Sequence, residues 1–319
     1  MEILSLCLTV KETLWGGRRL IEDYGFVSGG DNAAEAWLLS CHPDGPSYVQ
    51  NGKYRGKTLE QAIAAEGIGV LGTNNADKAD FPVLIKLIDA ADKLSVQVHP
   101  DNGYARRVEN ENGKTEAWLI LDAAPGAQLV YGVNREVDRP AFAQAVANGT
   151  LDTLLNFVSV KAGDVVFIPA GMLHAIGAGI LLAEVQQSSN TTYRVFDYNR
   201  RDKNGKLRQL HVQKATDVVD LRVPTGSFAS MGKRTVRPGG AKTLLTSCAY
   251  FSMTKTEVSG TLEDAADDRS FVSLLVLSGE GTLAGNNQTI VLKKGVSIFV
   301  PAGTAYTLNG EITLLETGT

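Results

Sequence analysis

The chain has 319 residues, of which 44% are hydrophobic and 21% are charged. This composition excludes a disordered polymer, and the length fits two globular domains. The formal net charge of −4 gives no broad basic surface, so we expect neither nucleic acid nor an anionic membrane as a partner. The three cysteines are widely spaced without any Cys-x-x-Cys pair, which indicates a reducing compartment and a cytoplasmic protein.

The first ten residues, MEILSLCLTV, are apolar but do not form a secretory signal. Glu2 stands where basic residues are required, and no small-residue cleavage site follows, so we expect a first strand here. No later stretch approaches the roughly 18 continuous apolar residues of a spanning helix, so no membrane segment is expected.

Short apolar runs dominate the rest of the chain, and 33 glycines with ten prolines separate them. Runs such as Val83 to Ile88 and Val165 to Ile168 are typical of strands joined by turns, which predicts a mainly β fold. Helical patterns are few, at residues 58–66, 101–108 and 139–147. We expect these short helices to decorate the first of two β domains.

Residues 93–100 alternate strictly between polar and apolar side chains, so Ser95, Gln97 and His99 share one face of a predicted strand. The preceding apolar run contains Lys86, and a two-residue turn at Ala90-Ala91 would set Lys86 opposite Ser95. Taken alone, this strand is equally typical of a sheet edge with a solvated polar face.

An internal repeat is the most informative feature of the organisation. SVKAGDVVFIPAG at residues 159–171 recurs as VLKKGVSIFVPAG at residues 291–303. Each copy predicts a Lys/Gly turn, a buried strand and a Pro-Ala-Gly turn that reverses the chain. Between the copies, residues 222–240 are rich in Gly, Pro, Ser and Arg, so we interpret them as a linker.

The repeat resembles the second half of the cupin motif, in which a metal-binding histidine follows the Pro-x-Gly turn by three residues. The first copy supplies His174, whereas the second has Tyr306 at that place. We therefore expect two cupin-type jelly-roll β-barrels: residues 1–225 as a catalytic, metal-binding domain and residues 226–319 as a degenerate domain without a metal site.

Four side chains form a plausible zinc set of two imidazoles, one carboxylate and one amide oxygen: His99, His174, Glu116 and Gln97. Their formal charge of −1 leaves a bound Zn²⁺ cationic and able to polarise a carbonyl or hydroxyl. The other two histidines, His42 in a turn and His211 before a mixed segment, are weaker ligand candidates.

Across essentially the whole chain, the sequence resembles type I mannose-6-phosphate isomerases in their short bacterial form. Five segments carry the resemblance: LWGG at 14–17, QVHPD at 97–101, GKTE at 113–116, PAGMLH at 169–174 and EVQQSSNTTYRVFDY at 184–198. The resemblance implies one zinc ion per chain, bound by the four side chains above, and interconversion of mannose 6-phosphate and fructose 6-phosphate through a cis-enediol.

The same resemblance implies roles for further residues. It places the sugar phosphate at Lys86 and Ser95 and makes Trp15 a further substrate-binding candidate. It places a second group around the reacting carbons: Lys114, Glu184 and Arg194 as catalytic residues and Arg200 in substrate binding. The strand pattern agrees. Glu184 falls on one face of a predicted strand, and Arg194 and Arg200, which are separated by an even number of positions, fall on one face of the next.

Other readings stay open at this point. Lys86 could be a lysine at the edge of the core, and Glu184 with Arg194 could be a buried ion pair. The proton-transfer base could be Glu184, Lys114 or a metal-bound water. A non-catalytic sugar-binding or metal-binding cupin is the alternative from another class; a cupin dioxygenase is disfavoured because such enzymes commonly use His-x-His. The sequence leaves the oligomeric state undetermined.

Overall fold

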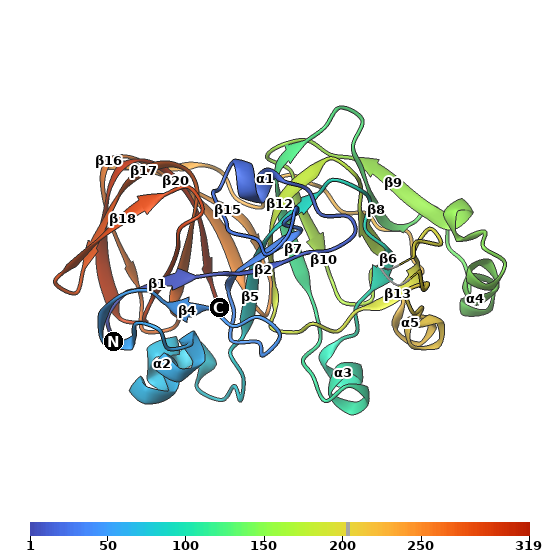
Figure 1. Ribbon diagram of the computed structural model, residues 1–319, viewed down its shortest axis with the longest axis horizontal. Helices are drawn as coiled ribbons and strands as arrows, with labels where there is room; N and C mark the ends of the chain where they lie inside the picture. Colours follow the sequence, from blue (N-terminus) through green and yellow to red (C-terminus); the bar gives the residue numbers. More distant parts are fainter. Residues whose placement is uncertain (202–204) are drawn as a thin grey trace. The chain divides into compact units, whose positions relative to one another are not determined.

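A computed structural model describes residues 1–201 and 205–319, and the fold is mainly β (Figure 1). The chain forms two compact units. Unit 1 contains Met1–Val10, Ala36–Lys86 and Ala229–Thr319, and unit 2 contains Lys11–Glu35 and Leu87–Phe228. Each unit thus joins segments that are distant in sequence. The division after residue 225 into two consecutive domains stays a prediction.

The strands run in chain order as β1 (Leu4–Cys7), β2 (Thr9–Lys11), β3 (Glu35–Leu39), β4 (Tyr48–Val49), β5 (Val83–Ala90), β6 (Val96–Val98), β7 (Glu116–Ala123), β8 (Gln128–Val133), β9 (Leu155–Ser159), β10 (Val165–Ile168), β11 (His174–Ile176), β12 (Ile180–Gln187), β13 (Tyr193–Phe196), β14 (Thr235–Arg237), β15 (Gly240–Ser247), β16 (Ser252–Ala266), β17 (Val272–Gly285), β18 (Gln288–Lys293), β19 (Ser297–Val300) and β20 (Thr304–Gly318). The α-helices are α1 (Arg19–Glu22), α2 (Leu59–Glu66), α3 (Asn102–Val108), α4 (Arg139–Ala147) and α5 (Val212–Val218). Short 3-10 helices are η1 (Gly52–Tyr54), η2 (Ile68–Leu71), η3 (Thr73–Asn75) and η4 (Leu151–Leu154).

In unit 1, one large antiparallel sheet has the order β14-β15-β16-β20-β17-β19-β1-β4, and β18 pairs with β17. The long strands β16, β17 and β20 lie side by side (Figure 1). Alternate side chains of these strands point into one buried apolar cluster that includes Leu274, Leu308 and Leu314. The second copy of the sequence repeat forms the end of β18, all of β19 and the turn into β20, as predicted.

In unit 2, a five-stranded sheet has the order β13-β6-β11-β8-β9, and β10, β7 and β12 are consecutive neighbours in a second sheet. The first copy of the repeat forms the end of β9, all of β10 and the turn into β11, again as predicted. Two registers follow from this topology: His174 on β11 lies opposite Gln97 on β6, and Glu116 on β7 lies opposite Ile168 on β10. Gln97 and His174 therefore lie on neighbouring strands of one sheet, and Glu116 lies on a strand of the other.

The three predicted helices form within one residue of their expected bounds. Thr58 closes a capping box with Gln61 before α2, Asp101 caps α3, and Asp138 caps α4, which has Pro140 in its first turn. The expectation that all three decorate one domain was wrong, because α2 belongs to unit 1 whereas α3 and α4 belong to unit 2. Every helix in the described ranges is too short or too polar to cross a lipid bilayer.

The predicted hairpin at Ala90-Ala91 was wrong. β6 pairs with β11 and β13, whereas β5 belongs to another sheet. The chain leaves β5 at Ala90 and changes sheets before β6, and on the way Leu94 N donates to Ile176 O. Strand alternation fixes which side chains share a face, but it does not fix the partner strand, so Lys86 and Ser95 are not cross-strand neighbours.

The predicted linker at 222–240 is shorter than expected. Its last part forms the edge strand β14, which pairs with β15. Unpaired polar segments and exposed edge strands have similar compositions, because an edge strand keeps one side in water. Within the predicted linker, residues 222–234 lack regular structure.

Candidate metal centre

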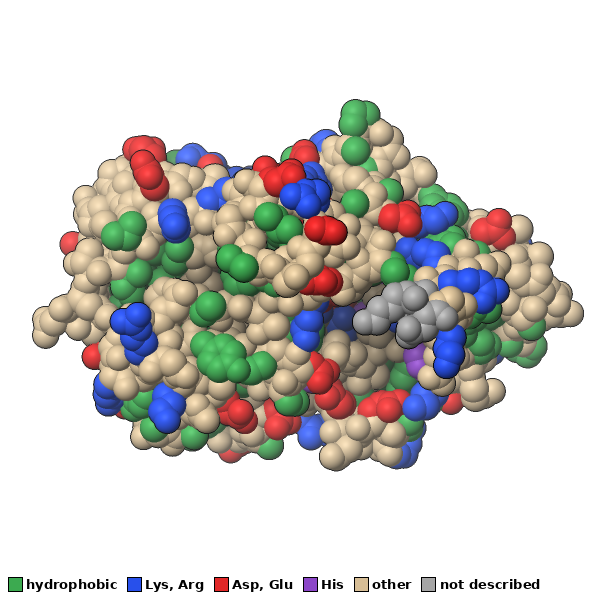
Figure 2. Space-filling model, viewed as in Figure 1, with side chains coloured by type: hydrophobic (Ala, Val, Ile, Leu, Met, Phe, Trp, Pro, Cys, Tyr) green, Lys and Arg blue, Asp and Glu red, His purple; other side chains and the backbone are tan. Residues whose placement is uncertain are grey.

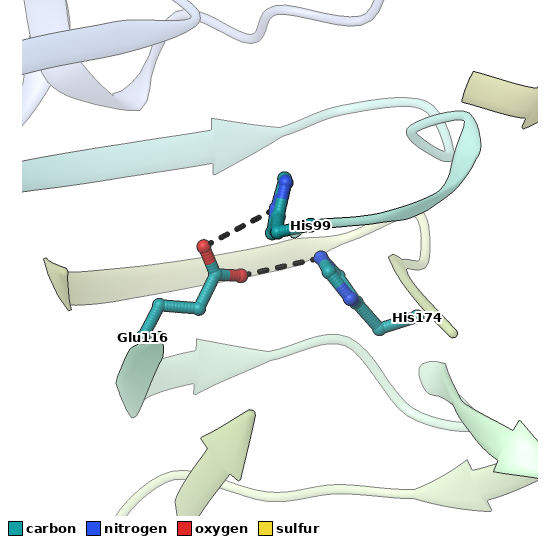
Figure 3. Close-up of side chains that lie close together, drawn as sticks. All are labelled: His99, Glu116 and His174. Carbon is teal, nitrogen blue, oxygen red and sulfur yellow. Dashed lines mark ion pairs between the residues drawn. The ribbon is translucent and has the colours of Figure 1, made fainter. Parts of the chain in front are cut away.

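Three buried side chains of unit 2 converge on one point (Figure 3). Glu116 begins β7, His174 begins β11, and His99 follows the end of β6. Glu116 Oε1 lies 3.2 Å from His174 Nε2, and Glu116 Oε2 lies 3.5 Å from His99 Nε2. The candidate ligand atoms all lie within 4.8 Å of one another, and two imidazoles with one carboxylate form a donor set that suits zinc.

The outer nitrogen of each imidazole is bound to a backbone carbonyl. His99 Nδ1 lies 2.9 Å from Thr191 O, and His174 Nδ1 lies 2.9 Å from Met172 O. A carbonyl oxygen can only accept, so both Nδ1 atoms carry the proton and both Nε2 atoms present a lone pair. Histidine ligands in metal sites are commonly oriented in this way.

These tautomers make the centre electrostatically incomplete. The lone pairs of both Nε2 atoms face the oxygens of Glu116, and neither oxygen accepts a well-aligned hydrogen bond from a described residue, although the Lys114 ammonium lies 3.1 Å from Glu116 Oε2. Burying acceptors against acceptors is unfavourable unless a cation lies between them. The residues present therefore fit a bound metal ion.

The charge states also suit metal binding. Burial, reinforced by the nearby Lys114 ammonium, holds the pKa of His99 well below its usual value, so this ring stays neutral. Burial by itself would raise the pKa of Glu116, but positive charge at the cluster, above all the Lys114 ammonium, holds that pKa well below its usual range. A neutral imidazole and an ionised carboxylate are the forms that bind a metal.

Gln97 and Lys114 border the three ligands. The side-chain amide of Gln97 lies 3.4 Å from His174 Nε2, and a flip of the amide would bring its oxygen to that place. Lys114 Nζ lies 3.2 Å from His99 Nε2 and 3.1 Å from Glu116 Oε2, and its side chain is buried. The structure thus brings both residues to the cluster, as the sequence predicted.

Glu184 lies on β12, directly across the ladder from Trp118 on β7. The indole Nε1–H of Trp118 donates to Glu184 Oε2 over 2.9 Å, and both side chains are buried. The indole also packs edge-on against the His174 ring, with centroids 5.6 Å apart. The sequence analysis did not single out Trp118, although its position two residues after Glu116 placed it on the same strand face.

Arg194 on β13 donates from Nε to Ser95 Oγ over 3.1 Å and from Nη1 to Gln209 O over 3.1 Å. Gln97, the residue across the ladder from Arg194, belongs to the candidate ligand set. Burial and the neighbouring Arg208 lower the pKa of Arg194. The structure therefore brings Ser95 and Arg194 together near the ligand strands.

Arg200 was expected on the same strand face as Arg194, and this was wrong. β13 ends at Phe196, and both Tyr198 and Asn199 have positive φ values of 54° and 55°, which turn the backbone away from the strand. Arg200 instead donates from Nη2 to Asp197 Oδ1 over 2.6 Å.

Arg208 completes this basic group and was missed by the sequence analysis. Its Nε donates to Asp197 Oδ2 over 2.6 Å, so Asp197 bridges Arg200 and Arg208. Burial opposes ionisation of Asp197, but the two guanidinium groups hold its pKa below the usual range. On the face drawn in Figure 2, Lys and Arg side chains gather over the segment that follows β13. Arg200 Nη1 also lies 3.6 Å from the more exposed Asp92 carboxylate. Two carboxylates thus meet three arginines when the neighbouring Arg194 is included, which leaves the group cationic and suited to an anion.

Two further candidates are buried elsewhere. Trp15 is 4% exposed and packs in the apolar cluster of unit 2 with Ile88 and Trp118. Lys86 belongs to unit 1, where its Nζ lies 5.0 Å from the centre of the Trp37 ring.

The second copy of the repeat has a different centre, inside unit 1. Tyr306 stands at the place of His174 and lies opposite Asp264, as His174 lies opposite Gln97. Its hydroxyl lies 3.4 Å from Asp264 Oδ2, and burial, with Glu316 and Asp264 nearby, raises the pKa of Tyr306 well above its usual value. In place of the histidine ligand, the second copy thus has the buried hydroxyl of Tyr306 beside the carboxylate of Asp264.

A lysine supplies the positive charge at this second centre. Lys242 Nζ forms ion pairs with Asp264 and, over 2.7 Å, with Glu316. Thr256 Oγ1 also donates to Glu316 over 2.9 Å. One lysine of the chain itself therefore offsets part of the negative charge of the two carboxylates at this second centre.

We expect Lys242→Met to lower the free energy of unfolding by about 3 kcal/mol, because it leaves two largely buried carboxylates without their cation. Lys255→Met is the matched control, since Lys255 lies 3.7 Å from Glu257 at the surface of the same sheet and exposed pairs contribute less than about 1 kcal/mol. Urea unfolding measures both variants. Equal losses in the two would contradict the structural role of Lys242.

The fold and the site together define a cupin-type β protein whose buried His-Glu-His cluster could hold a metal ion. Two family models match the chain: "Phosphomannose isomerase type I, catalytic domain" over residues 3–118 and "Mannose-6-phosphate isomerase, cupin domain" over residues 241–317. The expected cupin class is thereby confirmed.

Relatives match along nearly the full length. Mannose-6-phosphate isomerase of Streptococcus mutans is 37% identical, over 94% of this chain and 92% of the relative. The Bacillus subtilis isomerase ManA is 38% identical, over 92% and 91%. The crystal structure of the mannose 6-phosphate isomerase from Bacillus subtilis superposes with a TM-score of 0.92 at 35% identity, covering 99% of each chain. The chain therefore belongs to the type I mannose-6-phosphate isomerase family.

Proposed function

We propose that this protein interconverts mannose 6-phosphate and fructose 6-phosphate with the help of one zinc ion. The buried cluster of His99, Glu116 and His174 carries the proposal, because two imidazoles and one carboxylate within 4.8 Å of one another form a donor set that suits a metal cation. Membership of an isomerase family supports the substrate. With Gln97, these three residues would hold the zinc ion, which as a Lewis acid would polarise a sugar oxygen near C1 or C2.

Glu184 is the proposed base. Its carboxylate would remove the hydrogen on C2 as a proton. The released electron pair would form the C1–C2 double bond while the π pair of C1=O moves to O1, which takes up a proton to give a cis-enediol. Return of the first proton to C1, with loss of the O2 proton as C2=O forms, would give the ketose. Lys114 is less suited to this role, because its ammonium is paired with Glu116 at 3.1 Å, whereas Glu184 is held as an acceptor by Trp118.

Arg194 would stabilise the negative charge that develops on the sugar oxygen, since a guanidinium stays protonated and donates in fixed directions. We propose that the phosphate binds Lys86 and Ser95 and that Arg200 contributes positive charge. The contact of Ser95 with Arg194 and the cationic group around Asp197 support an anion at this end of the sheet. Trp15 would help to shape the sugar site. Such a phosphate contact supplies positioning away from the reacting carbons.

A cytoplasmic location is part of the proposal. All three cysteines, which lie in the described part of the chain, are free thiols, and this suits a reducing compartment.

A coupled assay of the purified protein on mannose 6-phosphate, with metal analysis of the same sample, tests the proposed function. Turnover with about one zinc ion per chain is the expected result. No turnover at full metal content would instead favour a non-catalytic sugar-binding cupin.

We expect Lys86→Met to weaken binding of the phosphorylated sugar by about 1.5–3 kcal/mol, the size of a lost charge-assisted hydrogen bond. Turnover of unphosphorylated mannose should be nearly unchanged, because that sugar lacks the group that Lys86 binds. Steady-state kinetics on both substrates measures the difference. Equal losses on both sugars would move Lys86 from phosphate binding to a structural role.

A further inference from the structure

The indole of Trp118 contacts two groups that the proposed reaction needs. Its Nε1–H donates to Glu184 Oε2 over 2.9 Å, and its ring packs edge-on against the His174 imidazole at 5.6 Å and 69°. Trp118 is fully buried, and it stands two residues after Glu116 on β7. One rigid side chain therefore touches a candidate ligand and the candidate base, and shares a strand face with a second ligand.

Packing alone does not account for this arrangement. A phenylalanine could supply an aromatic ring edge to His174, but it has no N–H for the buried carboxylate of Glu184. A hydrogen bond to an ionised acceptor is stronger than one between neutral groups. A glutamate has several rotatable bonds, whereas a buried tryptophan has two that its neighbours hold fixed.

Placement of the carboxylate matters for the chemistry. A base that moves one proton between adjacent carbons must reach both of them, and a misplacement of about 1 Å can cost on the order of 100-fold in rate. The cross-strand pairing places Glu184 beside Trp118, whose ring packs against that of His174. The hydrogen bond then selects one orientation of the carboxylate.

We propose that Trp118 is a positioning residue for proton transfer, which orients the Glu184 carboxylate relative to the metal-binding ring of His174. This inference rests on the proposed function, in which Glu184 is the base. Trp118 itself exchanges no proton with the sugar.

Trp118→Phe tests the proposal, because it keeps an aromatic ring and removes the N–H donor together with the second ring of the indole. We expect kcat to fall by about 10- to 100-fold, as for a lost hydrogen bond to a charged group. Zinc content and KM should stay within about twofold of the wild type. Trp118→Met, whose flexible side chain fills irregular space, replaces the phenylalanine variant should that variant fail to fold.

Ile120→Val is the matched control. Ile120 follows Trp118 by two residues on β7, is 1% exposed and packs in the same apolar cluster. The substitution costs about 1 kcal/mol of stability without touching a polar contact. A kcat loss in the control equal to that in Trp118→Phe would overturn the proposal, since loosened packing would then explain both.

The double variant with Glu184→Gln separates this inference from the proposed function. If Trp118 acts through Glu184, adding Trp118→Phe to Glu184→Gln should slow turnover by less than about twofold. Losses that multiply, or a kcat within twofold of wild type in Trp118→Phe alone, would overturn the positioning role. Full activity of Glu184→Gln alone would overturn the assignment of the base. If kcat of Trp118→Phe were reduced while Glu184→Gln kept full activity, Trp118 would not act through Glu184.

Discussion

Chelation should abolish turnover, and added zinc should restore it, because all the proposed ligands serve one ion. His99→Ala and His174→Ala should each weaken zinc binding by more than about 100-fold, since loss of a residue that merely supports a ligand already costs 10- to 100-fold. The expected loss follows from the geometry, in which both Nε2 atoms face Glu116 at 3.2–3.5 Å. Metal analysis of the dialysed variants, with activity measured on the same samples, gives the result.

Tyr306→Phe provides the control for the metal prediction. Tyr306 stands in the second copy of the repeat, where Lys242 supplies the cation at Asp264. This variant should keep its zinc and its activity. Zinc loss from Tyr306→Phe would show that the metal site was assigned to the wrong domain. Full turnover of rigorously metal-free protein would refute the metal mechanism.

Glu184→Gln should retain zinc and bind substrate, yet turn over at least about 100-fold more slowly, the range for loss of a general base. Glutamine preserves the shape of the side chain and an acceptor oxygen for Trp118, but it cannot take a proton from carbon. Exchange of the C2 hydrogen with solvent or with C1 should be lost as well. Steady-state kinetics and proton NMR of a sugar deuterated at C2 measure the two effects.

Lys114→Met is the comparison that can reassign the base. If Glu184→Gln exchanges the C2 hydrogen normally while zinc-loaded Lys114→Met does not, the base is Lys114. Arg194→Ala should also slow turnover with its metal content intact, because Arg194 contacts Ser95 and Gln209 and no candidate ligand side chain.

Local sequence signals predicted the elements of this protein well. The helical patterns at 58–66, 101–108 and 139–147 predicted α2, α3 and α4, which Thr58, Asp101 and Asp138 cap because a helix N-terminus leaves amides that such side chains accept from. The repeated Pro-Ala-Gly turns likewise predicted β10 and β19 and the turns that follow them. These features depend only on residues close in sequence.

The sequence alone determined the β class, the repeated cupin motif and the candidate ligands His99, Glu116 and His174, because residue type, strand alternation and family resemblance can be read directly from the sequence. Only the tertiary structure decided the partner of each strand, since strands distant in sequence compete for the same backbone hydrogen bonds. In the tertiary structure, Lys86 is therefore not in the predicted register with Ser95, and the backbone turns after β13, so that Arg200 does not share a strand face with Arg194. The tertiary structure also revealed the contacts of Trp118, Arg208 and Lys242, because each of them joins residues that only folding brings within a few ångströms.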